Sequence, residues 1–493
     1  MAAYAHGEGV VELPLMDFAP DLAFDASNNG SLTLVDMDQC QPTVKGYQAL
    51  NLAQPYGTTS GLPARPLGAT LAYFSDYSFG IFAGTTNHLY RFNSLTNLWV
   101  QADALGSSTF GCQPTQPWRF AQFANDVIAV NGSSASAVPQ VATGSGGSFA
   151  TLAGSPPATA NCVLSVNGQV MMTSGQSWYV SALGTDNNWA PNVQTQAGTG
   201  NLYDFPGAIT ALAPIFRNVV AFKTGSMWLG NYIGGQSVWS WQPISDETGT
   251  WCQEAVINLP DGVAFLGLDD FYVCRGYVPQ RIPNSLKEWV FDIADQTKLP
   301  WYMASRYDPY HAVCYWYYVS KNPPFATIPD RYVAWNTRTG RWAAGYLNTP
   351  CLPSPNWCPG PSTGGLPGVF TGLYFDTNNV LQTWSGAPGN MMLMTGYIGS
   401  PNNYTQMLRV KPVYYVKPTT FTVQPYHVAN LGDADITGPT TVLGRDGWYF
   451  FRQYDRWHRF QINATGPGTI QPNVQMGAEI SALLVDLRQG GWR

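Results

Sequence analysis

The chain has 493 residues, including 50 glycines and 37 prolines; 14% of its residues are aromatic and only 11% are charged. Glycine and proline break helices and form turns while aromatic residues favour strands, so the composition predicts an all-β, turn-rich protein. The formal net charge of −6 and the lack of any lysine- or arginine-rich run argue against a duplex-binding surface, which needs clustered positive charge.

The N-terminus lacks a basic region followed by an apolar one, so we expect no secretory signal, and no apolar run approaches the roughly 18 residues of a membrane span. The cysteines show no CxxC spacing. The closest pair, Cys351 and Cys358, has no neighbouring histidine, which disfavours zinc. We expect buried free thiols and assembly in a reducing compartment.

In chain order, residues 1–60 come first and do not repeat. Proline and glycine in residues 18–21, 28–30 and 38–47 indicate extended chain and turns. We therefore expect an extended docking segment here.

Residues 61–389 contain one hairpin pattern seven times: an apolar strand, a small or polar turn, then an aromatic strand. The copies start at positions 81, 127, 170, 220, 263, 313 and 369. A recurrence of about 40–50 residues with strands inside each unit is typical of β-propeller blades. The sequence predicts a propeller of six or seven blades over this range.

A second element recurs at Phe92–Trp99 and Trp335–Trp342, and more loosely at Phe375–Trp384. Asn or Asp is expected to cap the turn, Gly or Asn to adopt positive φ, and the flanking aromatic residues to face each other across the strands. This element resembles the outer hairpin of kelch-type propeller blades.

The sequence around residues 283–294 predicts one helix, with Ser285 and Glu288 in capping-box spacing and Leu286, Trp289 and Ile293 on one face. Residues 390–493 no longer repeat but still contain strand-like runs. They predict a β-sandwich-like accessory domain or strands that complete the propeller edge.

A search for catalytic groups finds no convincing set. Residues 245–251 are one residue short of a sialidase Asp box and occur once. The pairs Asp246–Glu247 and Asp269–Asp270 are adjacent, and adjacent strand residues point to opposite faces, so we expect turn residues. The histidines at 6, 88, 311, 427 and 458 have no metal-binding spacing. The sequence predicts no catalytic, cofactor-binding or metal-ligating residue and no enzyme.

Four arginines gather near the C-terminus and alternate with aromatic residues. One interpretation is a stripe that contacts nucleic acid or another anionic partner; the alternative, which we favour, is a solvated strand face partly neutralised by Asp446 and Asp455. The arginines are Arg445, Arg452, Arg456 and Arg459, and the aromatic residues are Tyr449, Tyr454, Trp457 and Phe460.

Several blocks are similar to tail proteins of short-tailed phages (podoviruses). They cover residues 18–21, 38–47, 179–189, 196–198, 205–207, 227–241, 249–253 and 267–272. The resemblance implies a tail hub or nozzle subunit, a structural virion protein. Family members form a ring, generally a homohexamer, below the head-to-tail adaptor, carry tail fibres or spikes, and let genomic DNA pass through the lumen during ejection without sequence-specific binding.

The composition agrees with a ring subunit, which needs wide, weakly charged, aromatic-rich contact faces. An acidic lumen would let DNA slide, since cationic contacts would slow its release. The alternative function is a carbohydrate- or receptor-binding propeller that uses exposed Trp and Tyr side chains.

Overall fold

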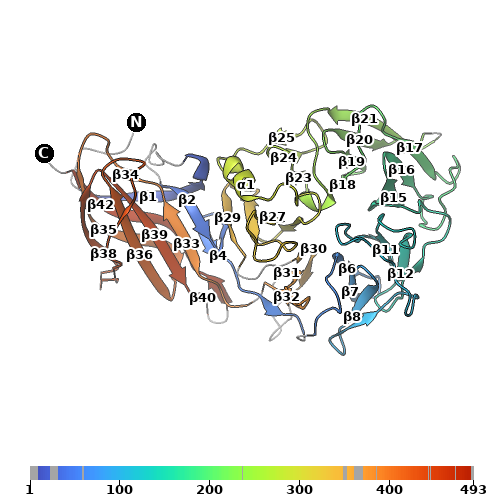
Figure 1. Cartoon of the computed structure of the whole chain (residues 1–493), viewed down its shortest axis with the longest axis horizontal. Coiled ribbons are helices and arrows are strands. Elements are labelled where there is room, and N and C mark those ends of the chain that lie inside the picture. The colour runs from blue at the N-terminus through green and yellow to red at the C-terminus, as the bar shows by residue number, and fades with distance from the viewer. Residues whose placement is uncertain are drawn as a thin grey trace.

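The computed structural model describes residues 9–22, 32–57, 60–235, 237–347, 352–359, 370–384, 386–441, 443–444, 446–471 and 474–489. Two β domains lie side by side along the longest axis (Figure 1). One is a ring of sheets around a central axis and the other is a stack of long strands. Among the described residues, no helix has the length and apolar character to cross a membrane.

The ring contains seven four-stranded antiparallel sheets among the described residues, which makes it a seven-bladed β-propeller. The first four blades take their strands in chain order, from the axis outwards. Blade 1 has β6 (Gly68–Tyr73), β7 (Phe79–Gly84), β8 (Leu89–Asn93) and β9 (Leu98–Gln101); blade 2 has β10 (Arg119–Phe123), β11 (Asp126–Val130), β12 (Gln140–Thr143) and β13 (Ala150–Thr151); blade 3 has β14 (Cys162–Val166), β15 (Gln169–Ser174), β16 (Ser177–Val180) and β17 (Gly198–Asn201); blade 4 has β18 (Ala211–Ile215), β19 (Asn218–Phe222), β20 (Met227–Tyr232) and β21 (Trp239–Ser245).

The last blade is closed by a strand from the other end of the chain. In blade 7, β5 pairs with β32 through Thr383↔Gln54 and Gln382↔Pro55, so a residue pair more than 300 positions apart closes the ring. Blade 5 has β22 (Val256–Leu259), β23 (Gly262–Leu266), β24 (Phe271–Cys274) and β25 (Gln280–Arg281); blade 6 has β26 (Ala304–Asp308), β27 (Val313–Tyr318), β28 (Arg331–Asn336) and β29 (Trp342–Tyr346); blade 7 has β30 (Leu352–Pro359), β31 (Phe370–Phe375), β32 (Leu381–Thr383) and β5 (Gln54–Pro55).

The repeated hairpin of the sequence is the second and third strand of each blade. The starts at 81, 127, 170, 220, 263 and 313 lie in β7, β11, β15, β19, β23 and β27, and Val369, outside the described residues, directly precedes β31. The predicted propeller is therefore confirmed, with seven blades.

The predicted outer hairpins form as expected in blades 1 and 6. Phe92 pairs with Trp99 and Trp335 with Trp342, with ring centroids 5.3 and 6.0 Å apart. The turn residues Asn97 and Gly340 have φ of 55° and 76°. The third hairpin differs: Phe375 pairs with Leu381, while Trp384 lies beyond the end of β32.

The second domain is a β-sandwich built from both ends of the chain. Strand β1 pairs with β42 of the first sheet and then with β2 of the second, so it joins the two. The first sheet has β1 (Gly9–Phe18), β3 (Cys40–Pro42), β4 (Tyr47–Ala49), β35 (Thr405–Val416), β38 (Tyr449–Asp455) and β42 (Glu479–Gln489); the second has β2 (Leu32–Asp38), β33 (Met391–Thr395), β34 (Ile398–Gly399), β36 (Thr420–Val428), β37 (Ile436–Thr437) and β39 (Trp457–Thr465); β40 (Pro467–Gln471) and β41 (Val474–Gly477) form a separate hairpin.

This pairing differs from the expected division into residues 1–60, 61–389 and 390–493. Residues 9–49 supply four sandwich strands instead of a separate extended segment, and β5 belongs to blade 7. The propeller is thus inserted between β4 and β33 of the sandwich. The physical reason is pairing between strands more than 400 residues apart, such as Leu13↔Leu483, which no local pattern reveals.

The expected helix exists as α1 (Lys287–Ile293), but its expected capping box does not form. Its N-cap is Leu286, which makes no side-chain cap hydrogen bond. Instead, Asp21 in the short helix η1 (Pro20–Leu22) accepts hydrogen bonds from the backbone N–H groups of Glu288 (3.1 Å) and Trp289 (2.9 Å). A side chain of the N-terminal segment therefore satisfies two of the helix's unpaired N–H groups.

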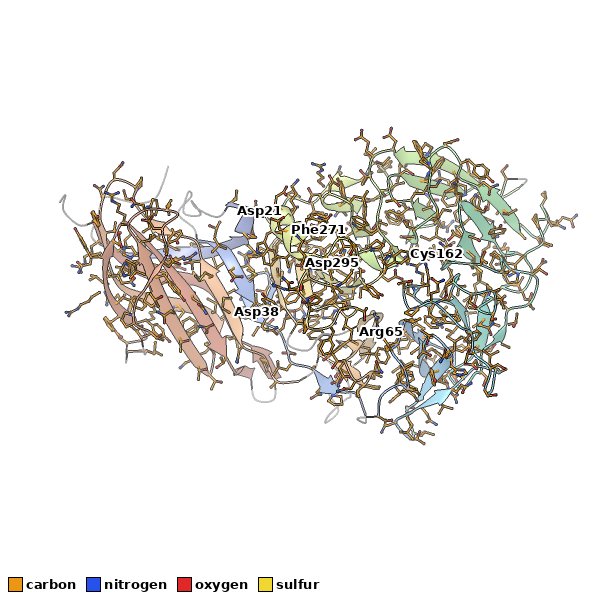
Figure 2. The ribbon with its side chains drawn as sticks, in the orientation of Figure 1. Asp21, Asp38, Arg65, Cys162, Phe271 and Asp295 are labelled. Atoms are coloured by element: carbon orange, nitrogen blue, oxygen red, sulfur yellow. The ribbon has the colours of Figure 1, made fainter. Side chains whose placement is uncertain are left out.

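The same N-terminal segment joins the sandwich to blade 6. In Figure 2, Asp21 and Asp38 lie where the two domains meet. The Asp38 carboxylate accepts a hydrogen bond from the Tyr346 N–H (2.7 Å), and Tyr315 and Tyr332 of blade 6 bond to Gln41 and Cys40. One buried apolar cluster runs from the sandwich interior into blades 5 and 6, so the two domains share a core.

Replacing Tyr332 by phenylalanine is expected to lower the free energy of unfolding by about 2 kcal/mol. The fully buried Tyr332 hydroxyl accepts from the Cys40 N–H (2.8 Å) and donates to the Cys40 carbonyl (2.6 Å), so its loss leaves two buried backbone groups unpaired. Urea unfolding followed by tryptophan fluorescence measures the change.

Tyr318→Phe in the same blade is the matched control. The Tyr318 hydroxyl is also buried but has no hydrogen-bond partner among the described residues, so its removal should cost nothing or stabilise slightly. Equal losses for the two variants would contradict the role given to Tyr332.

Candidate functional site

The acidic pairs singled out in the sequence lie in turns, as expected. Asp269 accepts hydrogen bonds from Tyr272 and Arg281, and the buried Asp270 accepts from the Phe271 N–H and from Asn284. Asp246 and Glu247 lie exposed in the bend after β21. Neither pair joins a group of three or more His, Cys, Asp or Glu side chains placed to hold a metal ion within the described part of the chain.

The expected arginine cluster is divided between two sheets. Arg452 and Tyr454 are exposed on β38 of the first sheet, whereas Arg459 lies on β39 of the second, where it contacts Asp435 and Tyr397. Tyr449, Trp457 and Phe460 are buried, so they offer no stacking surface. The expected neutralisation also differs, because Asp455 accepts from His427 and Asp446 from a backbone N–H. Arg445 lies outside the described residues.

The cysteines that the structure describes with their side chains are buried free thiols: Cys40, Cys112, Cys162, Cys252, Cys274 and Cys314. Burial raises the pKa of the Cys112 thiol to about 11. A thiol with a raised pKa is a weak nucleophile at neutral pH, so Cys112 is suited to packing. Cys351 and the side chain of Cys358 lie outside the described residues.

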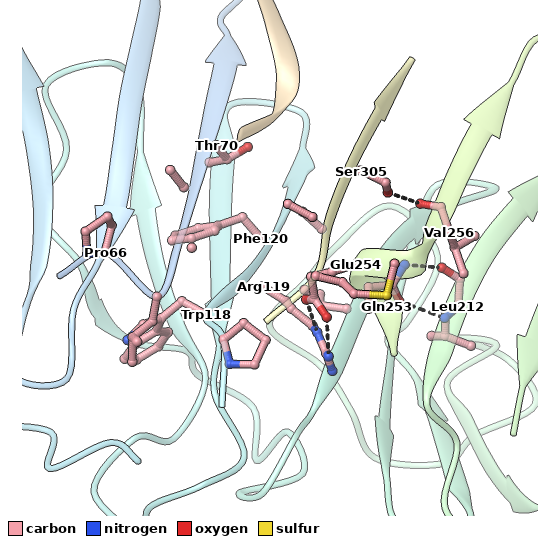
Figure 3. Close-up of a pocket in the computed structure, with 18 of the residues that line it drawn as sticks. Pro66, Thr70, Trp118, Arg119, Phe120, Leu212, Gln253, Glu254, Val256 and Ser305 are labelled. Atoms are coloured by element: carbon pink, nitrogen blue, oxygen red, sulfur yellow. Dashed lines mark hydrogen bonds and ion pairs between the residues drawn. The ribbon is translucent and has the colours of Figure 1, made fainter. Parts of the chain in front are cut away.

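The propeller axis holds a cavity of about 360 Å³, lined by the innermost strands of blades 1 to 6. The lining is mixed: Phe120, Leu212 and Val256 are apolar, whereas Gln122 and Asn258 are polar. Figure 3 labels two oppositely charged residues of this lining: Arg119 from β10 lies opposite Glu254 from the short helix η2 (Gln253–Ala255). The cavity is therefore the place where blades distant in sequence meet.

Arg119 and Glu254 form a bidentate ion pair across this axis. The guanidinium Nε lies 2.8 Å and Nη2 2.9 Å from the two carboxylate oxygens, and Nη1 donates to the Asn161 carbonyl at 2.6 Å. Burial alone would lower the pKa of Arg119, but the charge of Glu254 raises it above its ordinary value. Because both carboxylate oxygens are occupied, this geometry suits a brace between blades better than proton transfer.

A neighbouring amide extends this brace. The Gln253 side chain accepts from the Leu212 N–H (2.8 Å) and donates to the Leu212 carbonyl (2.9 Å), so it continues the backbone pairing of β18 at the axis. Sequence reasoning missed Arg119, Gln253 and Glu254. Their partners lie 41 and 135 residues away, and no local motif marks such pairs.

Large apolar side chains are exposed mainly on one face of the propeller. In an antiparallel blade, the connection between strands one and two and the connection between strands three and four emerge on the same side. These connections and the strand ends beside them carry the group that we call the apolar loop face: Tyr73, Tyr77, Phe79, Leu95, Leu183, Val193, Phe216, Ile233, Tyr277, Val278 and Tyr310.

Two aromatic residues of this face have unfavourable backbone conformations. Tyr77 and Phe216 lie at hairpin tips with φ of 64° and 55°, where glycine or asparagine is usual, and the two residues are 99% and 78% exposed. Each such residue costs of order 1 kcal/mol and gains no burial within this chain. Strain combined with exposed apolar surface is typical of a contact surface.

A second cavity opens beside the apolar loop face. It has about 330 Å³ and lies between the outer connections of blades 3 and 4, lined by Pro191, Val193, Val238 and Trp239 among others. A cavity that adjoins an exposed apolar face is suited to hold a side chain of a partner protein.

Comparison with known proteins assigns no family: no family model matches the chain, and no curated protein matches it. Among solved structures, it is similar to the computationally designed Ika8 protein (11% identity, TM-score 0.37, 70% of this chain and 99% of that one). It is also similar to YCF48 from Cyanidioschyzon merolae (10% identity, TM-score 0.39, 67% of this chain and 98% of that one). A third similar structure is the extracellular domain of BT4673 from B. thetaiotaomicron (10% identity, TM-score 0.38, 85% of this chain and 57% of that one). The propeller assignment rests on the strand pairing of this chain.

Proposed function

We propose that this chain is a structural subunit of a virion, a tail hub or nozzle protein of a short-tailed phage. Copies assemble in the host cytoplasm into a ring, a homohexamer, that extends the DNA channel below the head-to-tail adaptor and carries tail fibres or spikes. DNA passes through the lumen without sequence-specific binding. The protein acts without catalysis and without a cofactor.

The apolar loop face is the observation that carries this proposal. A protomer that exposes Tyr77, Leu95, Phe216 and Tyr277 on one face is suited to permanent contacts with other proteins. The core shared by the sandwich and blades 5 and 6 supports the proposal, because a tail component must transmit force without bending between its domains. The sequence blocks similar to phage tail proteins point to the same role.

A carbohydrate- or receptor-binding propeller is the second candidate. The nearly full exposure of Tyr77 at a hairpin tip favours it, because an aromatic ring held in solvent can stack on a sugar. A glycan array separates the two candidates. Specific retention of a glycan that is lost in Tyr77→Ser would support the second candidate and contradict the first.

Negative-stain imaging of the purified protein tests the proposed function. We expect closed rings with a central channel, or rings that form when the protein is mixed with its head-to-tail adaptor. Single two-lobed particles under both conditions would contradict a ring subunit.

A further inference from the structure

We propose that the ring contact joins two different surfaces of neighbouring copies: the outer face of the first sandwich sheet of one copy and the acidic loops of blades 3 and 4 of a second copy. This inference rests on the proposed function, because it assigns the surfaces by which copies of this chain would associate.

The first surface is a basic stripe across three neighbouring strands, β42, β35 and β38. Its members are Arg409, Lys411, Arg452 and Arg488, with the aromatic residues Trp448, Phe450 and Tyr454 between them. Arg409 is directly opposite Asp486 on one side and Phe450 on the other, while Gln406 is opposite both Arg488 and Tyr454. Residues directly opposite across strands share a face, so these side chains form rows on one surface.

Burial along β38 shows that this surface lacks a covering layer in the protomer. Tyr449, Phe451, Gln453 and Asp455 are buried towards the sandwich interior, while the alternating Phe450, Arg452 and Tyr454 are exposed. Exposed fractions of 53% for Phe450 and 47% for Tyr454 are large for aromatic residues in the middle of a strand. The stripe therefore combines positive charge with apolar area that a partner can bury.

Two arginines of the basic stripe, Arg409 and Arg488, lie beside a carboxylate of the same chain before any partner binds. The buried Asp486 carboxylate lies 2.9 Å from Arg409 Nε and 3.8 Å from Arg488 Nε, and the Arg409 guanidinium lies 4.4 Å from the centre of the Trp448 ring. Within the described residues, Arg452 takes part in no ion pair. Pre-ordered cations lose little conformational entropy when an anionic surface arrives.

The second surface consists of Tyr203, Asp204, Asp246 and Glu247, which we call the acidic loops. They lie on the connections that follow blades 3 and 4, and all four side chains are exposed. Lys223 holds the two connections together: its Nζ donates to the carbonyls of Leu202 and Phe205, and its own carbonyl accepts from the Thr250 N–H at 3.1 Å. In the described part of the chain, no ion pair involves these three carboxylates.

Charge complementarity selects a second copy as the occupant. Each protomer has a net charge of −6, so copies repel unless surfaces of opposite sign meet. The basic stripe and the acidic loops are of opposite sign, lie on different domains, and each carry exposed aromatic side chains for a desolvated centre. A contact between two different surfaces is heterologous, and heterologous contacts generate closed rings when the rotation closes.

Paired charge reversals test this assignment by mass photometry and sedimentation velocity. Lys411→Glu/Arg452→Glu gives a copy with two acidic surfaces, and Asp246→Lys/Glu247→Lys gives a copy with two basic ones. Each variant alone is expected to associate about tenfold more weakly or worse than the wild type. An equimolar mixture is expected to assemble, because every contact in an alternating ring again joins opposite charges.

The control is Lys321→Glu/Arg338→Glu, which makes the same change of charge on exposed residues of blade 6 and should assemble like the wild type. Circular dichroism confirms that each variant is folded.

If the wild type assembles and the charge-reversed variants assemble equally well, the result contradicts the proposed interface but not the proposed function. The same holds if the equimolar mixture of folded variants stays dissociated. A wild type that stays monomeric, also with the adaptor, contradicts the proposed function and the interface together. If the stripe binds nucleic acid instead, Lys411→Glu/Arg452→Glu will lose retention on DNA at low salt and assemble normally.

Discussion

Replacing Glu254 by alanine is expected to lower the free energy of unfolding by about 3 kcal/mol. The carboxylate is the counter-ion of Arg119 in the axial cavity, and the two side chains are only 24% and 12% exposed. Without Glu254 a mostly buried guanidinium loses two hydrogen bonds and its neutralising charge. The ion pair joins blade 2 to the start of blade 5, so we expect the whole propeller to unfold at lower urea concentration.

Two further variants separate the buried pair from a general loss of charge. Asp261→Ala removes the partner of Arg275 in a pair whose side chains are 59% and 50% exposed, and exposed pairs contribute only about 0–1 kcal/mol. Arg119→Met/Glu254→Met should be more stable than Glu254→Ala, since it leaves no unpaired buried charge. A loss in Glu254→Ala no greater than that in Asp261→Ala would contradict the role of the brace.

Acidification is expected to destabilise the sandwich through His458 on β39. The imidazole is fully buried; its Nε2 lies 3.2 Å from the Thr405 carbonyl oxygen and 3.0 Å from Thr405 Oγ1, while Nδ1 has no hydrogen-bond partner among the described residues. Burial lowers the pKa of His458 from 6.5 to about 4. Between pH 6.5 and about pH 4, the unfolded chain therefore binds a proton at His458 that the folded protein does not bind.

The stability that depends on neutral His458 is complete above pH 6.5 and is lost as the pH falls towards 4. A shift of this size corresponds to about 3 kcal/mol at the lower end. Urea unfolding at a series of pH values measures it. His458→Gln should have a flatter profile over this range. Parallel profiles for the wild type and His458→Gln would contradict the assignment.

The sequence predicted the propeller well because blade signals are local. An apolar strand, a tight turn and an aromatic strand lie within about a dozen residues, so each copy can be recognised without its neighbours. The turn chemistry was equally readable: Asn93 and Asn336 accept backbone hydrogen bonds within their turns, and Asn97 and Gly340 adopt positive φ. The units also indicate the range of the ring, except for β5, which lies outside residues 61–389 and completes blade 7.

The rest could not be predicted because it depends on pairs far apart in the chain. Strand β1 belongs to the sandwich because it pairs with β42, near the other end of the chain. The side chain that caps α1 is that of Asp21, which lies 267 residues from Glu288. A capping-box spacing at Ser285 and Glu288 was present but unused. The sequence does not show that Arg452 and Arg459, close in the chain, lie on strands of different sheets, because that depends on the partners of β38 and β39.

The molecular mass of the wild-type protein in solution tests the central claim most directly. At physiological salt, alone or with the head-to-tail adaptor, mass photometry is expected to find this chain in one closed assembly with six copies of the 53.8 kDa protomer. A protein that remains at the protomer mass under both conditions, at all concentrations measured, would contradict the account.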